Sequence, residues 1–243
     1  MIQGHYLNMV EAYDSGLETN WYDLLTNDKP YLISQNLSLA HRNANVSTFM
    51  SVGYTDQAGY HVGEDYKRWN ARLNLDNYVT NWLTIGMQSF ITSSDFSGLD
   101  ISRNLRYLSP YALARKENGE LTVQPGGLST NPLRAVEEAD HSDRRLNLFG
   151  NIYAKIDIPF IDGLSYKINY TTNYRNENEF LFRPYGANFQ GDGSKENDTR
   201  RSYSSDNILT YQKTFAQDHN FTATLLYGFE KREGNGTLAQ ASV

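Results

Sequence analysis

Residues Asp65 to Ser94 constrain the fold most, because apolar and polar side chains alternate there over an unusual length. The first arm sets Trp69, Ala71, Leu73 and Leu75 against Arg68, Asn70, Arg72, Asn74 and Asp76. The second arm sets Leu83, Ile85, Met87 and Ile91 against Thr84, Gly86, Gln88 and Thr92. Successive side chains of a strand point to opposite faces, so this period of two predicts two β-strands. The short stretch Tyr78 to Asn81 joins them, and the whole is predicted to be one long β-hairpin.

Each arm is longer than an ordinary strand, which has about 5 or 6 residues. At about 11 to 13 residues, the arms reach the length of about 9 to 11 that a membrane-spanning strand needs. One face is aliphatic and aromatic, and the other carries Arg, Asn, Gln and Asp. That pattern is typical of a barrel wall with lipid outside and water inside. The alternative is a secreted, soluble β-sandwich that binds carbohydrate or acts as an adhesin, which would cover its apolar face with a second sheet.

Composition favours many strands that are each wet on one side. Only 39% of the 243 residues are hydrophobic, yet there are 18 Tyr and 11 Phe, too many for a disordered chain. The net charge of −6 argues against a nucleic-acid partner, because phosphates require a basic surface. The absence of cysteine excludes disulfides and thiolate metal sites. No apolar run approaches the 18 or so residues of a transmembrane helix.

The same alternation predicts further strands at 34–41, 46–55, 145–158, 166–174, 201–214 and 220–230. Short connections (42–45, 78–81, 159–163 and 215–219) alternate with longer ones, above all the loops predicted at Asp95–Ser142 and Asn176–Asp198. Outer-membrane barrels show this asymmetry, with tight turns on the periplasmic side. Aromatic residues near strand ends fit an interfacial girdle; they are Tyr54, Trp69, Tyr78, Trp82, Tyr174 and Tyr203.

The predicted fold class is therefore all-β, an antiparallel up-and-down portion of a transmembrane β-barrel with about eight long strands. Outside the sheet, a short helix is expected at 6–12, a small anchored turn at Trp21–Leu25 and a Gly-rich loop at 231–243. Eight strands can close a small barrel, and such a barrel, enzyme or adhesin, is a second alternative. An incomplete slice with two unpaired edges is favoured. Residues 1–10 lack the apolar core of a signal peptide.

Several stretches, in order, resemble the SusC/RagA-type TonB-linked outer-membrane transporters. They are Asn20-Trp21-Tyr22-Asp23-Leu24-Leu25, Ser51-Val52-Gly53-Tyr54-Thr55-Asp56-Gln57-Ala58-Gly59, Tyr66-Lys67-Arg68-Trp69-Asn70-Ala71-Arg72-Leu73-Asn74-Leu75-Asp76, Asn131-Pro132-Leu133, Asn207-Ile208-Leu209-Thr210-Tyr211, His219-Asn220 and Leu226-Tyr227-Gly228-Phe229-Glu230. The resemblance implies that residues 1–243 are part of a 22-stranded barrel domain, without its plug domain or signal peptide. It also implies the outer membrane of a Gram-negative, Bacteroidetes-like cell.

The resemblance further implies active import of oligosaccharides or peptides. A SusD-like surface lipoprotein would act as the lid, and TonB would supply energy through parts that these residues do not contain. Outer-membrane lipid is the remaining expected partner.

Binding, rather than catalysis, is the chemistry that the sequence supports. The five histidines are scattered without metal-ligand spacing, so no metal or other cofactor is expected. No activated nucleophile or acid–base set is present, so no catalytic residue is predicted and the chain is not expected to be an enzyme. Lumen-facing Arg68, Asn70, Arg72 and Gln88 could hydrogen-bond a hydrated substrate, or simply line a wet wall or hold a plug. Tyr107, Tyr111 and Tyr185 in the loops could stack on a sugar, contact the lid, or only pack within the loops.

Overall fold

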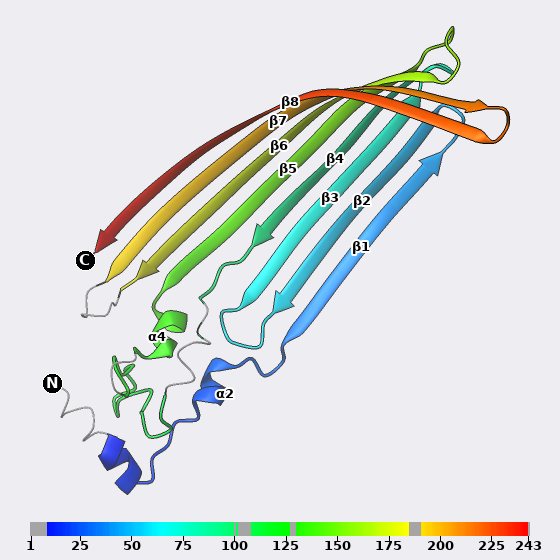
Figure 1. Cartoon of the computed structure of the whole chain (residues 1–243). Coiled ribbons are helices and arrows are strands. Elements are labelled where there is room, and N and C mark those ends of the chain that lie inside the picture. Colours follow the sequence, from blue (N-terminus) through cyan, green and yellow to red (C-terminus); the bar gives the residue numbers. More distant parts are fainter. Residues whose placement is uncertain (1–8, 100, 102–107, 127–129, 185–190, 243) are drawn as a thin grey trace.

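The structure, a computed structural model, describes residues 9–99, 101, 108–126, 130–184 and 191–242 (Figure 1). Eight strands form one antiparallel sheet in chain order. They are β1 (Tyr31–Arg42), β2 (Val46–Ala58), β3 (Asp65–Tyr78), β4 (Leu83–Asp95), β5 (Asp140–Asp157), β6 (Leu164–Arg183), β7 (Asp192–Phe215) and β8 (His219–Ser242). The helices are α2 (Trp21–Leu25), α4 (Pro132–Glu137) and a helical turn over residues 9–14. The predicted all-β fold and the hairpin formed by β3 and β4 are confirmed.

The sheet is an open, curved trough (Figure 1). β1 and β8 form its two edges, and no ladder joins them among the described residues, so these eight strands do not close into a small barrel. At one end, tight turns over 43–45, 79–82, 158–163 and 216–218 connect the strands. The described residues of the segment 96–139 and residues 9–30 lie at the other end, so the predicted asymmetry between the ends is confirmed.

Strand register sorts the side chains into two faces. Direct partners carry one apolar row from Leu37 through Val52, Ala71, Ile91 and Leu148 to Tyr174. These side chains are uncovered: Leu37 is 78% exposed, and Ile152 and Tyr227, farther along the same face, are 56% and 72% exposed. No second sheet packs on this face in the described part of the chain, so the sandwich alternative is wrong for it.

The residues of the predicted aromatic girdle do not all share one face, and the girdle itself stays a prediction. Tyr54 and Trp69 are direct partners on the apolar face, with ring centroids 4.5 Å apart, and Tyr174 and Tyr203 share that face. Tyr78 does not, because its register places it on the polar face with Asp76. The prediction for Tyr78 is therefore wrong.

Two predicted loops are in fact strands. β6 and β7 stay paired as far as Arg183 opposite Asp192, where the guanidinium donates hydrogen bonds of 3.0 and 2.6 Å to the carboxylate. Only residues 184–191 of the predicted loop 176–198 lie between the strands. Residues 231–242, predicted as a loop, continue β8 opposite β7. These extensions carry no apolar alternation that a sequence pattern could detect, because their few large apolar residues are either consecutive (Phe180, Leu181 and Phe182) or isolated (Leu238).

The only buried hydrophobic cluster of the described residues lies outside the sheet, at the loop end (Figure 1). It joins Trp21 and Leu25 of α2, Leu133 of α4, and Ile101, Ala112 and Ala114. The sequence predicted an irregular loop at 95–142, whereas α4 and the first residues of β5 lie within it. The anchored turn at Trp21–Leu25 is the helix α2, and the helix predicted at 6–12 is observed over 9–14, with 6–8 outside the described residues. Among the described residues, no helix has the length and hydropathy to cross a bilayer.

Candidate functional site

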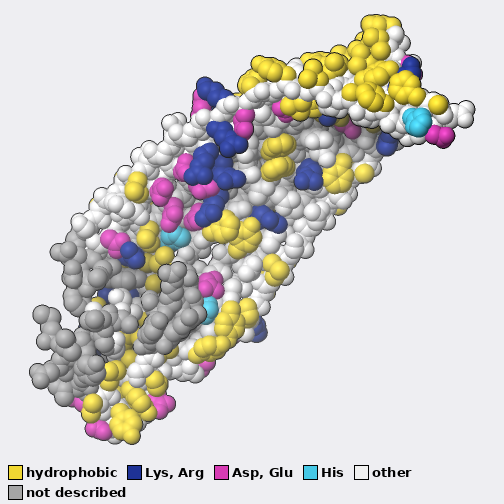
Figure 2. Space-filling view, in the orientation of Figure 1, with side chains coloured by type: hydrophobic (Ala, Val, Ile, Leu, Met, Phe, Trp, Pro, Cys, Tyr) yellow, Lys and Arg dark blue, Asp and Glu magenta, His cyan; other side chains and the backbone are white. Residues whose placement is uncertain are grey.

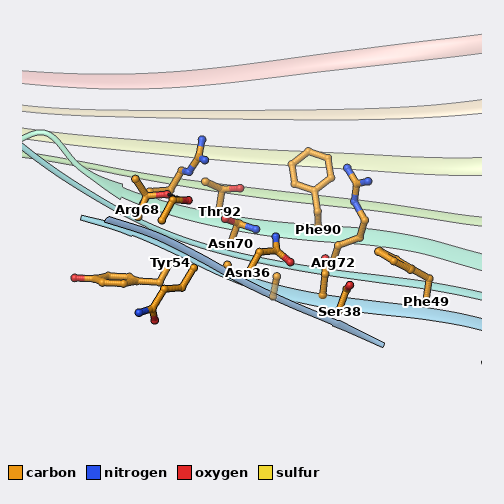
Figure 3. Close-up of a pocket in the computed structure, with 15 residues that line it drawn as sticks. Asn36, Ser38, Phe49, Tyr54, Arg68, Asn70, Arg72, Phe90 and Thr92 are labelled. Atoms are coloured by element: carbon orange, nitrogen blue, oxygen red, sulfur yellow. Dashed lines mark hydrogen bonds between the residues drawn. The ribbon is translucent and has the colours of Figure 1, made fainter. Parts of the chain in front are cut away.

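The concave face of β1 to β4 holds a polar hollow of about 520 Å³ (Figure 3). Arg68, Asn70 and Arg72 of β3 line it together, as the sequence predicts for three residues spaced by two. Their partners on β2 are Thr55, Gly53 and Ser51. Side chains between these positions, such as Tyr54, point away to the apolar face (Figure 3).

The two arginines of the hollow are free to bind a ligand. Neither Arg68 nor Arg72 forms an ion pair or hydrogen bond with another described residue, and both are exposed. A guanidinium presents five donors in a planar fork that fits carboxylate, sulfate or hydroxyl oxygens. Asn36, Ser38 and Thr92 add neutral hydrogen-bonding groups around them. The hollow can therefore bind a hydrated or anionic group, but it contains no nucleophile paired with a base.

Asn70 also has a structural task. A Cβ added to Gly53 would lie 2.7 Å from Asn70 Oδ1, so the Asn70 side chain occupies the space that Gly53 leaves open. Gly53 therefore leaves room for the Asn70 amide within the hollow.

An aromatic stack bounds the hollow on its β5 side. Phe90 of β4 and Phe149 of β5 are direct partners, with ring centroids 5.1 Å apart and planes inclined by 15°. Stacked rings on a polar wall offer a flat apolar surface to a ligand. The sequence analysis did not select either residue, because both lie at polar positions of an alternating pattern.

The remaining predicted site residues are more scattered. Gln88 shares the polar face but lies two residues from Phe90 along β4, outside the residues that line the hollow. Tyr111 packs edge-on against Tyr13 at the loop end, where it lines a separate groove of about 560 Å³. Tyr107 and Tyr185 lie outside the described residues. A ligand role for all seven predicted residues stays a prediction.

Asn131 organises the loop end, and sequence reasoning missed this role. Its side chain is fully buried, and its amide donates two hydrogen bonds of 2.8 Å to the carbonyls of Ala114 and Thr122. Its Oδ1 accepts from the N–H of Leu133, capping α4. The signal was present, since Asn before Pro132 is a typical helix start.

Charge at the mouth of the trough is internally balanced. Asp95 accepts hydrogen bonds from the backbone and side chain of Ser97 and faces Arg144, whose Nε is 3.5 Å away. Partial burial opposes ionisation of this carboxyl, but the hydrogen bonds and Arg144 prevail and hold the pKa of Asp95 below its ordinary value. Arg145 donates to Asp143 and lies 4.7 Å from the Phe96 ring centroid. No group of three or more potential metal ligands occurs in the part of the chain that the structure describes.

Comparison with known proteins gives the fold and the relationship. The chain is 26% identical over 201 residues to TonB-dependent receptor P39 of Formosa agariphila, covering 80% of this chain and 19% of the relative. It is 23% identical to TonB-dependent receptor P3 of the same organism, covering 95% of this chain and 24% of the relative. The chain is related to the TonB-dependent receptors. It spans about a fifth to a quarter of the length of these curated relatives.

Solved structures agree with this relationship. The chain superposes on the RagAB peptide importer in its open-open state with a TM-score of 0.76 and 21% identity, covering 93% of this chain and 27% of that one. The closed-closed state gives a TM-score of 0.71. These matches show the fold of part of a SusC/RagA-type barrel, as the sequence analysis expected. The relatives are receptors and transporters rather than enzymes, in agreement with the expectation for this chain. No family model matches it.

Proposed function

We propose that this chain forms part of the wall of an outer-membrane TonB-dependent transporter that imports oligosaccharides or peptides. A SusD-like surface lipoprotein covers the loop end, and energy reaches the barrel from TonB through other parts of the transporter. TonB-dependent receptors are outer-membrane proteins, and the two-faced sheet is what supports placing this chain in that membrane. The RagAB likeness supports a SusC-type partner arrangement.

The position of the apolar band carries the proposal. Direct pairing leads from Leu37 on β1 to Glu233 on β8, yet the apolar residues of β8 on that face centre on Leu225. The band therefore slides by about eight residues, or about 26 Å, while seven steps between strands cover about 34 Å. The corresponding strand tilt is about 40°, within the range of about 35–45° found in membrane barrels. A soluble sheet has no reason to displace its apolar residues steadily from strand to strand.

Neighbouring residues of β5 offer a sharp test. Ile152 lies on the apolar face, whereas Asn151 lies on the polar face, where its amide donates to Thr171 Oγ1. The chain contains no cysteine, so Ile152→Cys and Asn151→Cys can each carry one spin label in protein reconstituted into lipid vesicles. We expect oxygen, which concentrates in lipid, to accelerate the electron-spin relaxation of the label at 152. A water-soluble nickel chelate should instead accelerate the relaxation of the label at 151. Equal effects of each agent at both positions, or the reverse order, would refute membrane insertion.

A further inference from the structure

A second polar hollow, of about 600 Å³, lies on the same concave face between β5 and β8. Asn173, Ser202 and Ser204 line it with Arg175, Arg200 and Arg232. Figure 2 shows Lys and Arg side chains gathered with Asp and Glu over β6 and β7 on the hollowed face. Nothing in the sequence pattern selected this place, because its residues extend beyond the apolar part of each strand.

The cations of this second hollow are unevenly paired. Arg200 forms an ion pair of 2.6 Å with Asp198, and Arg232 one of 2.7 Å with Glu230. Arg175 directly faces Arg200 across β6 and β7, and it has no ion-pair or hydrogen-bond partner among the described residues. Like charges placed opposite each other are destabilising. An anionic ligand group between the two guanidinium groups would remove that repulsion.

Two hydrogen-bond acceptors beside the hollow lack a donor. Asn147 Oδ1 and Asn173 Oδ1 are buried without a hydrogen bond to any described residue. Asn147 is the direct partner of Arg175, and Asn173 is the direct partner of Phe149. A buried acceptor without a donor costs about 1–3 kcal/mol. A ligand that brings N–H donors to these amides complements them, whereas a purely anionic ligand would not.

Strand register connects the two hollows through the aromatic stack. One row of direct partners on the concave face runs Arg72, Phe90, Phe149, Asn173, Ser202, Arg232. The five steps from β3 to β8 cover about 24 Å at about 4.8 Å per step. Cations therefore stand at both ends of the row, and the stacked rings stand between them.

We infer that this row is a binding track for an extended acidic oligopeptide, with the Arg175 hollow as its second carboxylate subsite. The inference rests on the proposed import function and specifies its substrate. Arg175 lies on β6, two residues from Asn173, so it is three strand steps, about 14 Å, across the sheet from Arg72 and about 7 Å along it. About five extended residues at about 3.4 Å each span the resulting distance of about 16 Å. Carboxylates at the two ends reach Arg72 and Arg175, an apolar side chain at the centre covers Phe90 and Phe149, and backbone N–H groups serve the asparagine acceptors.

The test uses the purified protein in detergent and two probe octapeptides. One has glutamates near both ends and leucines at the centre, and the other has glutamines there and an amidated carboxyl terminus. Arg175→Gln removes the unpaired cation without breaking any contact within the described residues. Lys213→Gln is the matched control, because Lys213 lies on the apolar face of β7 and forms no ion pair there.

We expect the wild type to bind the acidic peptide at least tenfold more tightly than the amide peptide, because charged hydrogen bonds are the stronger ones. Arg175→Gln should lower the affinity for the acidic peptide about tenfold and leave the affinity for the amide peptide unchanged. Lys213→Gln should change neither affinity. Equal affinity of wild type for both peptides overturns the inference. Binding of a sulfated oligosaccharide that depends on Arg175, with no binding of the acidic peptide, also overturns the inference. That outcome remains compatible with the proposed import function. Energised uptake is measured with the whole transporter that contains this chain, and its failure for peptides and oligosaccharides alike would overturn the proposed function itself.

Discussion

The aromatic ring of Tyr153 on β5 covers Gly86 on β4, its direct register partner. A Cβ added to Gly86 would overlap the ring, so the glycine provides the space in which the ring lies. From there the Tyr153 hydroxyl donates a hydrogen bond of 2.5 Å to Asp76 on β3. Lys167 of β6 places its Nζ 4.3 Å from the ring centroid. One side chain thus joins four neighbouring strands on the polar face.

Gly86→Ala should therefore destabilise the sheet. The new methyl group displaces the Tyr153 ring, and overpacking of this kind costs about 1–3 kcal/mol. Urea unfolding in detergent micelles measures the change. Gly150→Ala is the control, because a Cβ there meets Thr172 Cγ2 at an ordinary 3.6 Å. Equal stability of the two variants would show that the ring moves aside without cost.

Asn131→Ala should loosen the loop end without unfolding the sheet. The substitution removes the cap of α4 and leaves the carbonyls of Ala114 and Thr122 without their donor. Loss of a cap costs about 1 kcal/mol, and each buried group left unsatisfied adds about 1–3 kcal/mol. Limited proteolysis should then cut the segment 108–139 much faster while β5 to β8 stay protected.

The control for this experiment is Asn118→Ala. Asn118 is exposed, and its contacts are local: its Oδ1 accepts from the N–H of Glu120, and its side chain hydrogen-bonds the Glu120 carboxylate. Its loss should leave the rate of cleavage close to that of the wild type. Similar acceleration in both variants would mean that any lost turn contact opens the loop, and that Asn131 has no special role.

The sequence was sufficient to predict those strands in which apolar and polar residues alternate. β3 alternates apolar and polar residues from Arg68 to Asp76, and β4 does so from Leu83 to Gln88. The hairpin, its two faces and its turn follow from that period. The sequence pattern was insufficient where a strand lacks apolar residues of its own. β7 runs to 24 residues, but its first residues, from Asp192 to Arg201, include no apolar side chain. These residues are part of the strand because they pair with β6, which a pattern within β7 alone cannot predict.

The candidate site shows the same division. Arg68, Asn70 and Arg72 could be grouped from one strand, because a spacing of two fixes a common face. Phe149 and Arg175 could not be joined to them, since register across β4, β5 and β6 decides which residues become neighbours. The hydrophobic core around Trp21 could not be predicted for a related reason, because it is formed by segments that are up to more than 100 residues apart in the sequence.

Acid should weaken the contact between Asp95 and Arg144. The pKa of Asp95 is held below its ordinary value in the folded chain, so its contribution to stability is present above the unfolded value of about 3.9 and is lost as pH falls through the folded value. The contribution is below about 1 kcal/mol, because Asp95 is partly exposed to solvent. Asp95→Asn should be less stable than the wild type at pH 6, and the difference in unfolding free energy should shrink below pH 4. A difference independent of pH would rule out this charge effect.

Arg68→Gln with Arg72→Gln should separate binding from stability. Neither guanidinium has a partner among the described residues, so the free energy of unfolding should change by less than about 0.5 kcal/mol, as for other surface substitutions. Affinity for the glutamate-bearing octapeptide should fall about tenfold or more, because the first hollow loses both of its charged donors. Lys67→Gln, on the apolar face beside Arg68, removes one charge from the same strand and should leave that affinity unchanged. An unchanged affinity in the double variant would show that the first hollow is only part of the wet wall, and a matching loss in Lys67→Gln would show that net charge, rather than position on the concave face, governs binding.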